Sequence, residues 1–336
     1  MSNPRSALPV ITYSGALSAS DTEDRITSFT YTDKATGESD ICTFTLDNSD
    51  RLFMLKKIPK RGDKFEAKIV LRNWEKEGSP KTVKCGTFCC DDKTYSGWPL
   101  LCTIGGTAIP EKQAFHATER TKTWENMLIR EIASSICASY GLALSYDAGD
   151  IMVTSIEQSQ ETDSSFIKKL CENYGLNIKI YSGRITIYDA VRWESKEATK
   201  VLNIRKFGEG WTYNCTMVGV YTGATIKYTN GKEGDEYICT VGGGERILSI
   251  NEKVDSLGDA RIKAAARVNK ENRSEETLSG DILADPAICA GMVVKVAGIA
   301  GLSGKYFIDS VTHQLEADGP YMMSLEMHKV QEAVTA

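Results

Sequence analysis

A short pattern occurs twice near the middle of the chain and sets what that region can fold into. Ile132–Leu142 and Phe166–Leu176 each place apolar residues three or four positions apart, and each ends in Tyr-Gly-Leu. This spacing gives a helix with one buried stripe. Gly141 and Gly175 can adopt the left-handed conformation that ends a helix without a Cβ clash. The pattern therefore predicts two helices that each stop at a glycine.

After each glycine the apolar period changes to two. Leu142–Tyr146 and Leu176–Tyr181 alternate apolar residues with polar or small ones, as does a strand with one buried face. The second strand opens a hairpin, Asn177–Asp189, with Ser-Gly at its tip. Cys137 and Cys171 lie on the apolar stripes and are interpreted as core residues. Two helix-Gly-strand units are too few for a solenoid, which needs about three repeats.

Residues with capping side chains mark where these helices begin. The first helix is expected to run from Thr121 to Ser139, with Thr121 or Thr123 at its cap. The second is expected to follow Thr162–Ser165, whose side-chain oxygens stand just before Phe166.

On both sides of this block the dominant period is two. Short strands separated by turns, such as the exposed turn at Asn230–Asp235, are typical of an antiparallel barrel or sandwich. One further helix is expected at Val254–Lys270, capped at Asp255 or Ser256. The expected strands are Ile26–Tyr31, Ile41–Leu46, Lys64–Leu71, Val83–Cys90, Trp211–Val218, Ala224–Tyr228, Tyr237–Val241, Thr277–Leu283, Met292–Val296, Tyr306–Leu315 and Tyr321–Met327.

These patterns predict an α+β fold that is mainly β. Residues 1–106 are expected to form a first antiparallel β-barrel domain, and residues 200–336 a second one that contains the helix near 254–270. Residues 107–199 are expected to form an α/β insertion built on the two helix-Gly-strand units. A length of 336 residues is enough for two or three domains with cores of their own.

Composition and charge argue against several classes of protein. With 41% hydrophobic and 25% charged residues, the chain is neither disordered nor fibrous. A net charge of −5 gives no support for a nucleic-acid-binding surface. The first residues hold no continuous apolar run, so no secretory signal peptide is expected. The most apolar tract, residues 287–302, is shorter than the ~18 residues of a membrane span and is interrupted by Lys295.

Four cysteines form the strongest candidate for a metal site. Cys85, Cys89 and Cys90 are close in sequence, and Cys102 follows. Zinc sites usually hold ligand pairs on tight turns, commonly as Cys-x2-Cys. Here the spacing is that of a strand, in which Cys85 and Cys89 face one side and Cys90 the other. We therefore expect no metal site, and we expect all ten cysteines to be free thiols that are mostly buried.

No catalytic, cofactor-binding or metal-binding residue is predicted. His116, His313 and His328 are far apart in sequence, and neither Gly-x-Ser-x-Gly nor His-Glu-x2-His occurs. A Ser/His/Asp or Cys/His set assembled from distant segments stays open at this level. Gly242–Gly244 lacks the Lys-Ser/Thr of a phosphate loop and is interpreted as a bulge or a tight approach. Two pairs of adjacent acids are interpreted as solvated surface groups: Asp91-Asp92 and Glu275-Glu276.

Several segments together carry a resemblance that no single motif carries. They are Phe29–Asp33 with Gly37–Asp40, Lys60–Asp63, Cys85–Phe88 leading to Trp98-Pro99, the two helix-Tyr-Gly-Leu units, and the closing pair Gly304–His313 and Gly319–Met327. With a barrel half on each side of an α/β insertion, this pattern resembles the phage tail hub proteins of the late control protein D family. Such proteins occur in contractile tails, tailocins and related prophage particles.

The resemblance implies a non-enzymatic structural part of a tail baseplate. It implies a homotrimer whose two barrel domains per chain make a pseudo-sixfold ring, with the tail tube or a tube-initiator protein above and the central spike below. Tape measure and baseplate wedge proteins are further candidate partners, whereas no membrane, cofactor or specific nucleic acid is expected. The expected location is a virion or phage-like particle assembled in the bacterial cytoplasm. The alternatives are a tail-associated cell-wall hydrolase and a soluble multidomain adaptor unrelated to phage.

Overall fold

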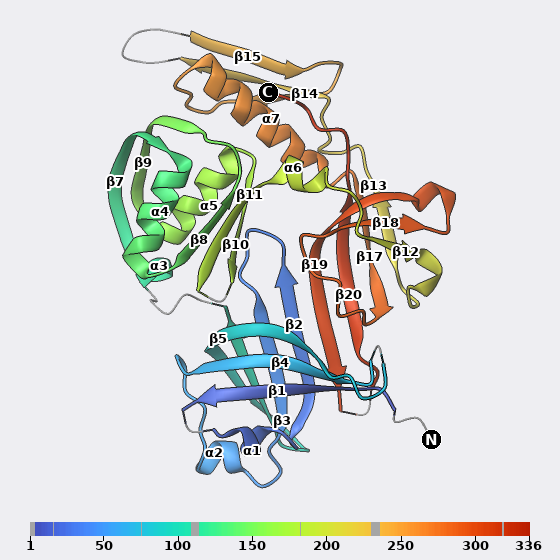
Figure 1. The fold of residues 1–336 in the computed structure, drawn as a ribbon. Coiled ribbons are helices and arrows are strands. Elements are labelled where there is room, and N and C mark those ends of the chain that lie inside the picture. The colour runs from blue at the N-terminus through green and yellow to red at the C-terminus, as the bar shows by residue number, and fades with distance from the viewer. Residues whose placement is uncertain are drawn as a thin grey trace.

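A twelve-stranded sheet extends from β1 near the lower end of the molecule up to β18 and β19, below the separate sheet of β14 and β15 (Figure 1). The structure is a computed structural model and describes residues 4–15, 17–74, 76–108, 114–181, 183–229, 236–317 and 319–336. In order of pairing, the strands are β1 (Ser6–Ser14), β4 (Lys64–Arg72), β5 (Lys81–Ser96), β6 (Leu101–Thr107), β3 (Ile41–Asp47), β2 (Ile26–Lys34), β19 (Gly304–Glu316), β20 (Met322–Lys329), β17 (Glu276–Leu283) and β13 (Thr212–Cys215). Two more strands extend the sheet from the first residues of β19, on the same edge that β2 pairs further along: β18 (Val293–Ala297) and then β12 (Lys200–Asn203).

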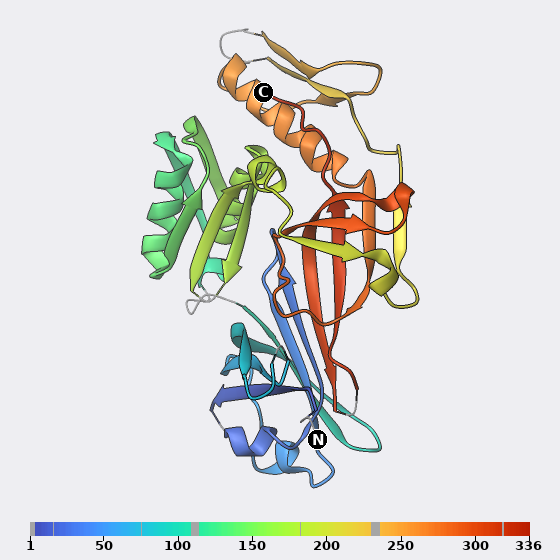
Figure 2. The same cartoon turned by 45° about the vertical axis from the view of Figure 1, so that its right-hand side comes forward.

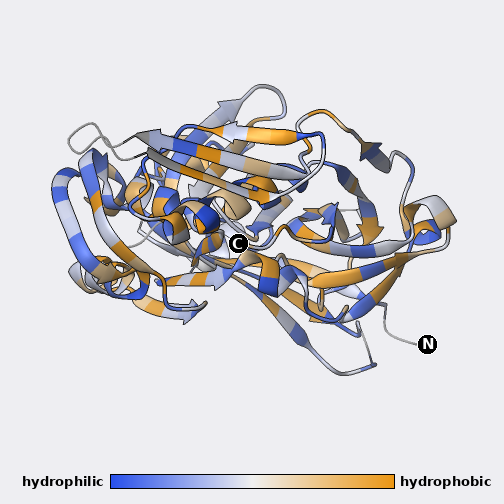
Figure 3. Ribbon diagram, turned by 90° about the horizontal axis from the view of Figure 1, so that it is seen from above, coloured by the Kyte–Doolittle hydropathy of each residue, from blue (hydrophilic) through white to orange (hydrophobic). Residues whose placement is uncertain are grey.

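The pairing of β2 with β19 joins the two halves of this sheet. The strands are antiparallel, and the hydroxyl oxygens of Thr32 and Thr312, 280 residues apart in the chain, lie 3.1 Å from each other. Hydrophilic and hydrophobic residues alternate along many of the strands, as the period of two predicts (Figure 3). A single apolar core contains Phe44 and Phe65 from the first half and Met323 and Leu325 from the second. The two halves therefore share both a sheet and a core.

The prediction of a mainly β, α+β fold is confirmed, but the two β halves are not closed barrels. A closed barrel requires its first and last strands to pair. Within the described residues the first half ends at β1, and the second half ends at β12 on one side and at β13 on the other. The sequence pattern shows which residues alternate but not whether the outermost strands meet.

The α/β insertion contains the two predicted helix-Gly-strand units. Its helices are α3 (Ala114–Ala117), α4 (Ile129–Tyr140) and α5 (Asp163–Asn173), and its strands are β7 (Glu119–Leu128), β8 (Ala143–Asp147), β9 (Met152–Thr162), β10 (Leu176–Tyr181) and β11 (Arg184–Asp189). Gly141 and Gly175 have φ of +68° and +70°, and each is followed by a strand as predicted. The hairpin of β10 and β11 is also confirmed, except for Ser182, which lies outside the described residues.

The predicted first helix is wrong over its first half. Residues 119–128 form β7, which pairs with β9, and the helix begins only at Ile129. Trp124 explains the difference, because this buried side chain of β7 stacks on Phe166 of α5 with ring centroids 6.2 Å apart. The carboxylate of Glu131 then accepts the backbone N–H of Leu128 at 2.9 Å and caps α4. The second predicted start is confirmed, since Thr162 caps α5.

A small subdomain lies apart from the large sheet. It consists of β14 (Gly223–Thr229), β15 (Glu236–Gly242) and β16 (Ile247–Ile250), covered by α7 (Leu257–Asn272). Ser256 caps α7 by accepting the backbone N–H of Asp259 at 3.1 Å, which confirms one of the two predicted caps. The helix packs on this separate sheet through Ala264 and Val268 rather than inside the second half of the large sheet. The expected turn at Asn230–Asp235 lies outside the described residues.

Short segments connect these parts. They are α1 (Ala19–Thr22), α2 (Leu52–Leu55), α6 (Ala190–Glu194) and the 3-10 turns η1 (Ile204–Lys206) and η2 (Ala300–Leu302). Figure 2 shows α7 above the place where the insertion and the large sheet approach each other. Among the described residues, no helix is both long and apolar enough to cross a membrane.

Candidate functional site

The four candidate cysteines do not form a site, and a bulge at Gly86 decides how they lie. Gly86 has a φ of +110°, and the register of β5 on β4 shifts beside it. The shift turns both Cys85 and Cys90 into the core, while Cys89 lies on the opposite, half-buried face. The prediction that Cys85 and Cys89 share a face is therefore wrong, because strict alternation assumes an unbroken ladder. Cys102 is buried on β6.

The remaining thiols follow the prediction. All ten cysteines are free, and only Cys215 and Cys289 are exposed. Cys137 and Cys171 lie in the core of the insertion, as interpreted from their helical stripes. The residues that the structure describes contain no group of three or more His, Cys, Asp or Glu side chains that could hold a metal ion.

The three histidines have different surroundings. His116 of α3 contacts the ring of Phe115. His313 of β19 is stacked near Tyr31, and its Nδ1 lies 2.6 Å from the hydroxyl of Tyr321. Burial lowers the pKa of His313 to about 4, so this imidazole is neutral at pH 7. Of the three histidines, only His328 of β20 lies within ion-pair distance of carboxylates, those of Glu194 and Asp309.

The glycine run and the acid pairs have structural explanations. A Cβ on Gly242 would lie 2.4 Å from the carbonyl oxygen of Thr222, so the expected tight approach is confirmed where β14 and β15 meet. Asp91 and Asp92 are exposed, as interpreted. Glu276 is not a freely solvated group, because its carboxylate accepts hydrogen bonds from the Tyr213 hydroxyl and the Lys329 ammonium, both at 2.6 Å.

A buried ion cluster fixes the insertion to the first β half. Lys179 of β10 forms an ion pair with Asp33 and lies 3.5 Å from Asp40, which follows the β2–β3 turn. Burial raises the pKa of Asp40 to about 6, against the opposing effect of Lys179. In the same turn, the Thr36 hydroxyl exchanges two hydrogen bonds with the backbone of Ile178, at 3.2 and 3.1 Å. These contacts anchor β10 to the sheet.

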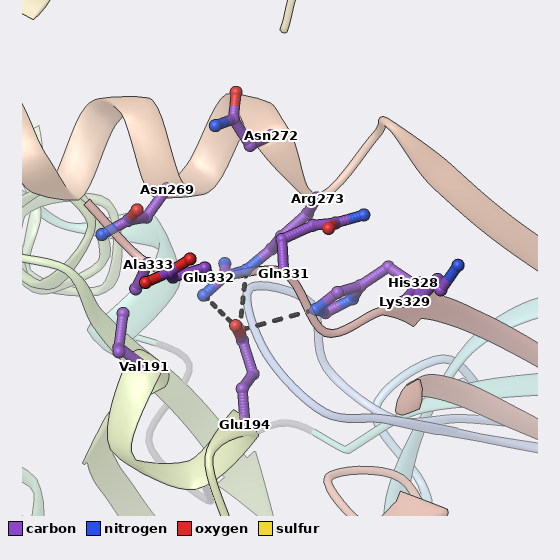
Figure 4. A pocket seen from close by; sticks show the side chains of 10 residues that line it. All are labelled: Val191, Glu194, Asn269, Asn272, Arg273, His328, Lys329, Gln331, Glu332 and Ala333. Carbon is purple, nitrogen blue, oxygen red and sulfur yellow. Dashed lines mark hydrogen bonds and ion pairs between the residues drawn. The ribbon is translucent and has the colours of Figure 1, made fainter. Parts of the chain in front are cut away.

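A second ion cluster lies where three parts of the molecule meet. Glu194 ends α6, Arg273 follows α7, and His328 belongs to β20 (Figure 4). One carboxylate oxygen of Glu194 is 2.7 Å from Arg273 Nη2 and 3.6 Å from His328 Nε2. The other ring nitrogen of His328, Nδ1, lies 2.8 Å from Asp309 on β19. We call these four residues the junction cluster.

The charges of the junction cluster support one another. Burial alone would lower the pKa of His328, but the hydrogen bond to Asp309 and the nearby carboxylate of Glu194 outweigh it and raise this pKa to about 9. Burial likewise opposes ionisation of Glu194, yet His328 and Arg273 hold its pKa below the usual range. The hollow beside the cluster has a volume of about 20 Å³, enough for about one water molecule. The cluster is therefore suited to joining parts rather than to binding a ligand.

Large apolar side chains are exposed in both β halves. In the first half, Trp98 at the tip of the β5–β6 hairpin is 83% exposed, and Leu55 of α2 is 69% exposed. In the second half, a hollow of about 470 Å³ lies between β12 and β17, with Val201 and Leu283 exposed at its mouth and Phe207 buried in its wall. These exposed apolar side chains are candidates for contacts with other molecules.

Two proteins similar to this chain in sequence come from phages. The chain is 25% identical over 278 residues to the probable baseplate hub protein of Escherichia phage 186, an alignment that covers 80% of this chain and 67% of that protein. It is 26% identical over 215 residues to the probable baseplate hub protein of Escherichia phage P2, covering 62% of this chain and 53% of that protein. The aligned part is thus about half of the P2 protein. The model of the YQBQ-like family matches residues 246–328.

The fold is shared along almost the whole chain with a solved structure. The 43 kDa tail protein of prophage MuSo2 from Shewanella oneidensis superposes with a TM-score of 0.72, covering 97% of this chain and 99% of that one. Sequence identity in this comparison is 16%, so the likeness concerns the fold.

Proposed function

We propose that this chain, because it belongs to the phage tail hub family, is a structural baseplate hub of a contractile phage tail or of a related phage-like particle. The observation that carries the proposal is the similarity to two baseplate hub proteins over 80% and 62% of this chain. The likeness in fold to a prophage tail protein supports it. A hub acts through its surfaces, which agrees with the exposed apolar side chains in both β halves.

Three copies of the chain are proposed to form a pseudo-sixfold ring. The two β halves of each copy, residues 1–106 and 200–336, would supply the six ring units, and the insertion, residues 107–199, would support the ring from outside. Head-to-tail contacts that close after a small number of copies are an ordinary way to build such a ring. The edges at β1, β12 and β13, which pair on one side only within the described residues, support this arrangement.

The proposed partners are a tail tube or tube-initiator protein on one face of the ring and the central spike protein on the other. Tape measure and baseplate wedge proteins are proposed as further contacts. The proposed location is the tail baseplate of the particle, assembled in the bacterial cytoplasm.

Native mass spectrometry tests the proposal. The chain is measured alone and after co-expression with the tube and spike proteins of the same particle. We expect a complex that contains three copies of this chain, either alone or with the spike. A chain that stays monomeric in every mixture and binds neither neighbour would overturn the proposal.

A non-enzymatic role is part of the same proposal. It is supported by the three histidines, which lie in different parts of the fold. Only His328 lies within ion-pair distance of carboxylates. A zymogram with peptidoglycan as substrate tests this part, and we expect no clearing. Clearing by the purified chain, lost on substitution of a residue of the insertion, would establish the cell-wall hydrolase instead.

A further inference from the structure

The chain enters and leaves the subdomain formed by β14, β15, β16 and α7 at one place. The chain enters it through residues 216–222, after β13, and leaves it through residues 273–275, before β17. These two linkers run side by side, because the backbone N–H of Thr216 donates to the carbonyl of Glu275 at 2.9 Å. Two paired linkers at one point form the geometry of a hinge.

Part of the entry linker is exposed to solvent. Met217 and Val218 are 71% and 84% exposed, and Gly219 has a φ of +76°. The linker is fixed again at its far end, where the side-chain amide of Asn272 bonds both the N–H and the carbonyl of Tyr221 at 2.8 Å. Bending is therefore expected near residues 217–219, between two fixed points.

The face that α7 turns toward the insertion is mostly polar. The Tyr174 hydroxyl donates to Asp259 at 2.8 Å, and Lys270 forms an ion pair with Glu172 at 3.0 Å. Ile262 adds an apolar contact with the insertion core. A hollow of about 80 Å³ remains in this contact, beside Gly175. Polar contacts of this kind between parts of one chain commonly allow relative motion.

Residues 330–336 run from the large sheet to the subdomain and form hydrogen bonds with both. The backbone N–H of Val330 donates to Lys305 of β19 at 2.8 Å. Four residues further, Asn269 of α7 bonds both backbone groups of Val334, accepting its N–H at 2.8 Å and donating to its carbonyl at 2.9 Å. The Val334 side chain packs against the core of the subdomain. Figures 1 and 2 both show this segment running beside α7.

We propose that the α7 subdomain pivots on the paired linkers 216–222 and 273–275, and that residues 330–336 are the strap that holds it closed against the insertion. The two hydrogen bonds between Asn269 and Val334 form the catch of this strap. The ion pair between Arg273 and Glu194 lies at the exit linker, and so at the pivot itself. Release of the catch lets the subdomain swing away without unfolding, because its core is separate from the core of the large sheet.

Distance measurements between two spin labels test the hinge. The exposed cysteines are first replaced by Cys215→Ser and Cys289→Ser, and labels are attached through Glu157→Cys on β9 and Ser249→Cys on β16, both exposed positions. In this background we expect one narrow distance distribution. Asn269→Ala removes both bonds of the catch and is expected to add a second population at longer distance.

A matched control and a second variant make the result decisive. Asn251→Ala changes an exposed asparagine of the same subdomain and is expected to leave the distribution unchanged. A chain that ends at Val330 lacks the catch altogether and should give the longer distance even if Asn269→Ala fails to fold. A single, unchanged distance in both catch variants, with circular dichroism equal to that of the background, would overturn the proposal. So would a broad distribution that is already present in the background.

Discussion

Buried charged side chains in this chain lie at joints between parts of the molecule. Lys179 and Asp40 join the insertion to the first β half, and Glu194 and His328 join α6 to β20. In an enzyme, such shifted pKa values would suggest acid-base chemistry. Here each group has its opposite charge within 4 Å, and the hollow that Glu194 and His328 line holds only about one water molecule. We therefore interpret the shifted pKa values as a consequence of joining structural units.

The shared core makes a prediction at the scale of one residue. Phe44 is fully buried in β3 and meets Phe65 at a ring distance of 5.2 Å, so Phe44→Ala is expected to lower the free energy of unfolding by about 3–5 kcal/mol. Leu55→Ala removes a side chain that is 69% exposed and is expected to change it by less than about 0.5 kcal/mol. Urea unfolding measures both. Equal losses in the two variants would contradict the assignment of the core.

The alternation of apolar and polar residues predicted many of the buried residues. It failed where a bulge interrupts the regular backbone of a strand. The thiols of Cys137 and Cys171 follow their helical stripe into the core as predicted. Cys85 does not follow strand alternation, because the bulge at Gly86 adds a residue that no sequence period reveals. Glu276 looked like a solvated acid, since its partner Lys329 is distant in sequence. Both misses depend on pairing between segments, which local patterns do not contain.

At the scale of elements, helix ends were predicted better than helix starts. The left-handed glycine that ends a helix is a strong signal, and both Gly141 and Gly175 were identified from it. The start of the first helix was misplaced because Thr121 and Thr123 suit a strand as well as a cap. What decides between the two is the pairing of β7 with β9, and the sequence of β7 alone does not show it.

The two glycines give a prediction with a built-in comparison. Ala at either position must adopt a left-handed conformation, which costs about 1–2 kcal/mol. An added Cβ meets nothing within 4 Å at Gly141, whereas at Gly175 it lies 3.3 Å from the Cβ of Ala266 on α7. We expect Gly141→Ala to lose only the conformational cost, and Gly175→Ala to lose more because α7 must shift. Thermal unfolding of the two variants measures the difference in stability. Equal losses of stability would contradict the prediction, because they would mean that α7 shifts without a cost.

At the scale of the whole molecule, the sequence indicated the order of many helices and strands but not how they combine. A β half on each side of an α/β insertion was expected, and the resemblance to tail hubs was drawn from segments spread along the chain. The continuous sheet was not expected, because the ladder between β2 and β19 joins residues such as Thr32 and Thr312 that are 280 positions apart. The hollow beside Leu283 was missed for a similar reason, since both of its walls come from separate strands.

The junction cluster predicts how stability of the whole molecule depends on pH. His328 has a folded pKa of about 9, above the usual 6.5, and it faces Asp309, Glu194 and Arg273. Its contribution is therefore fully present below about pH 6.5 and is lost as pH rises through 9. By order of magnitude, this rise in pKa corresponds to roughly 3 kcal/mol. Urea unfolding of wild type and His328→Gln between pH 6 and 10 should give free energies of unfolding that differ most at pH 6 and converge near pH 10.

His313→Gln is the matched control. Because His313 is neutral throughout this range, the stability lost in this variant should be independent of pH. Parallel curves for wild type and His328→Gln would mean that the charge of His328 does not hold the three parts together.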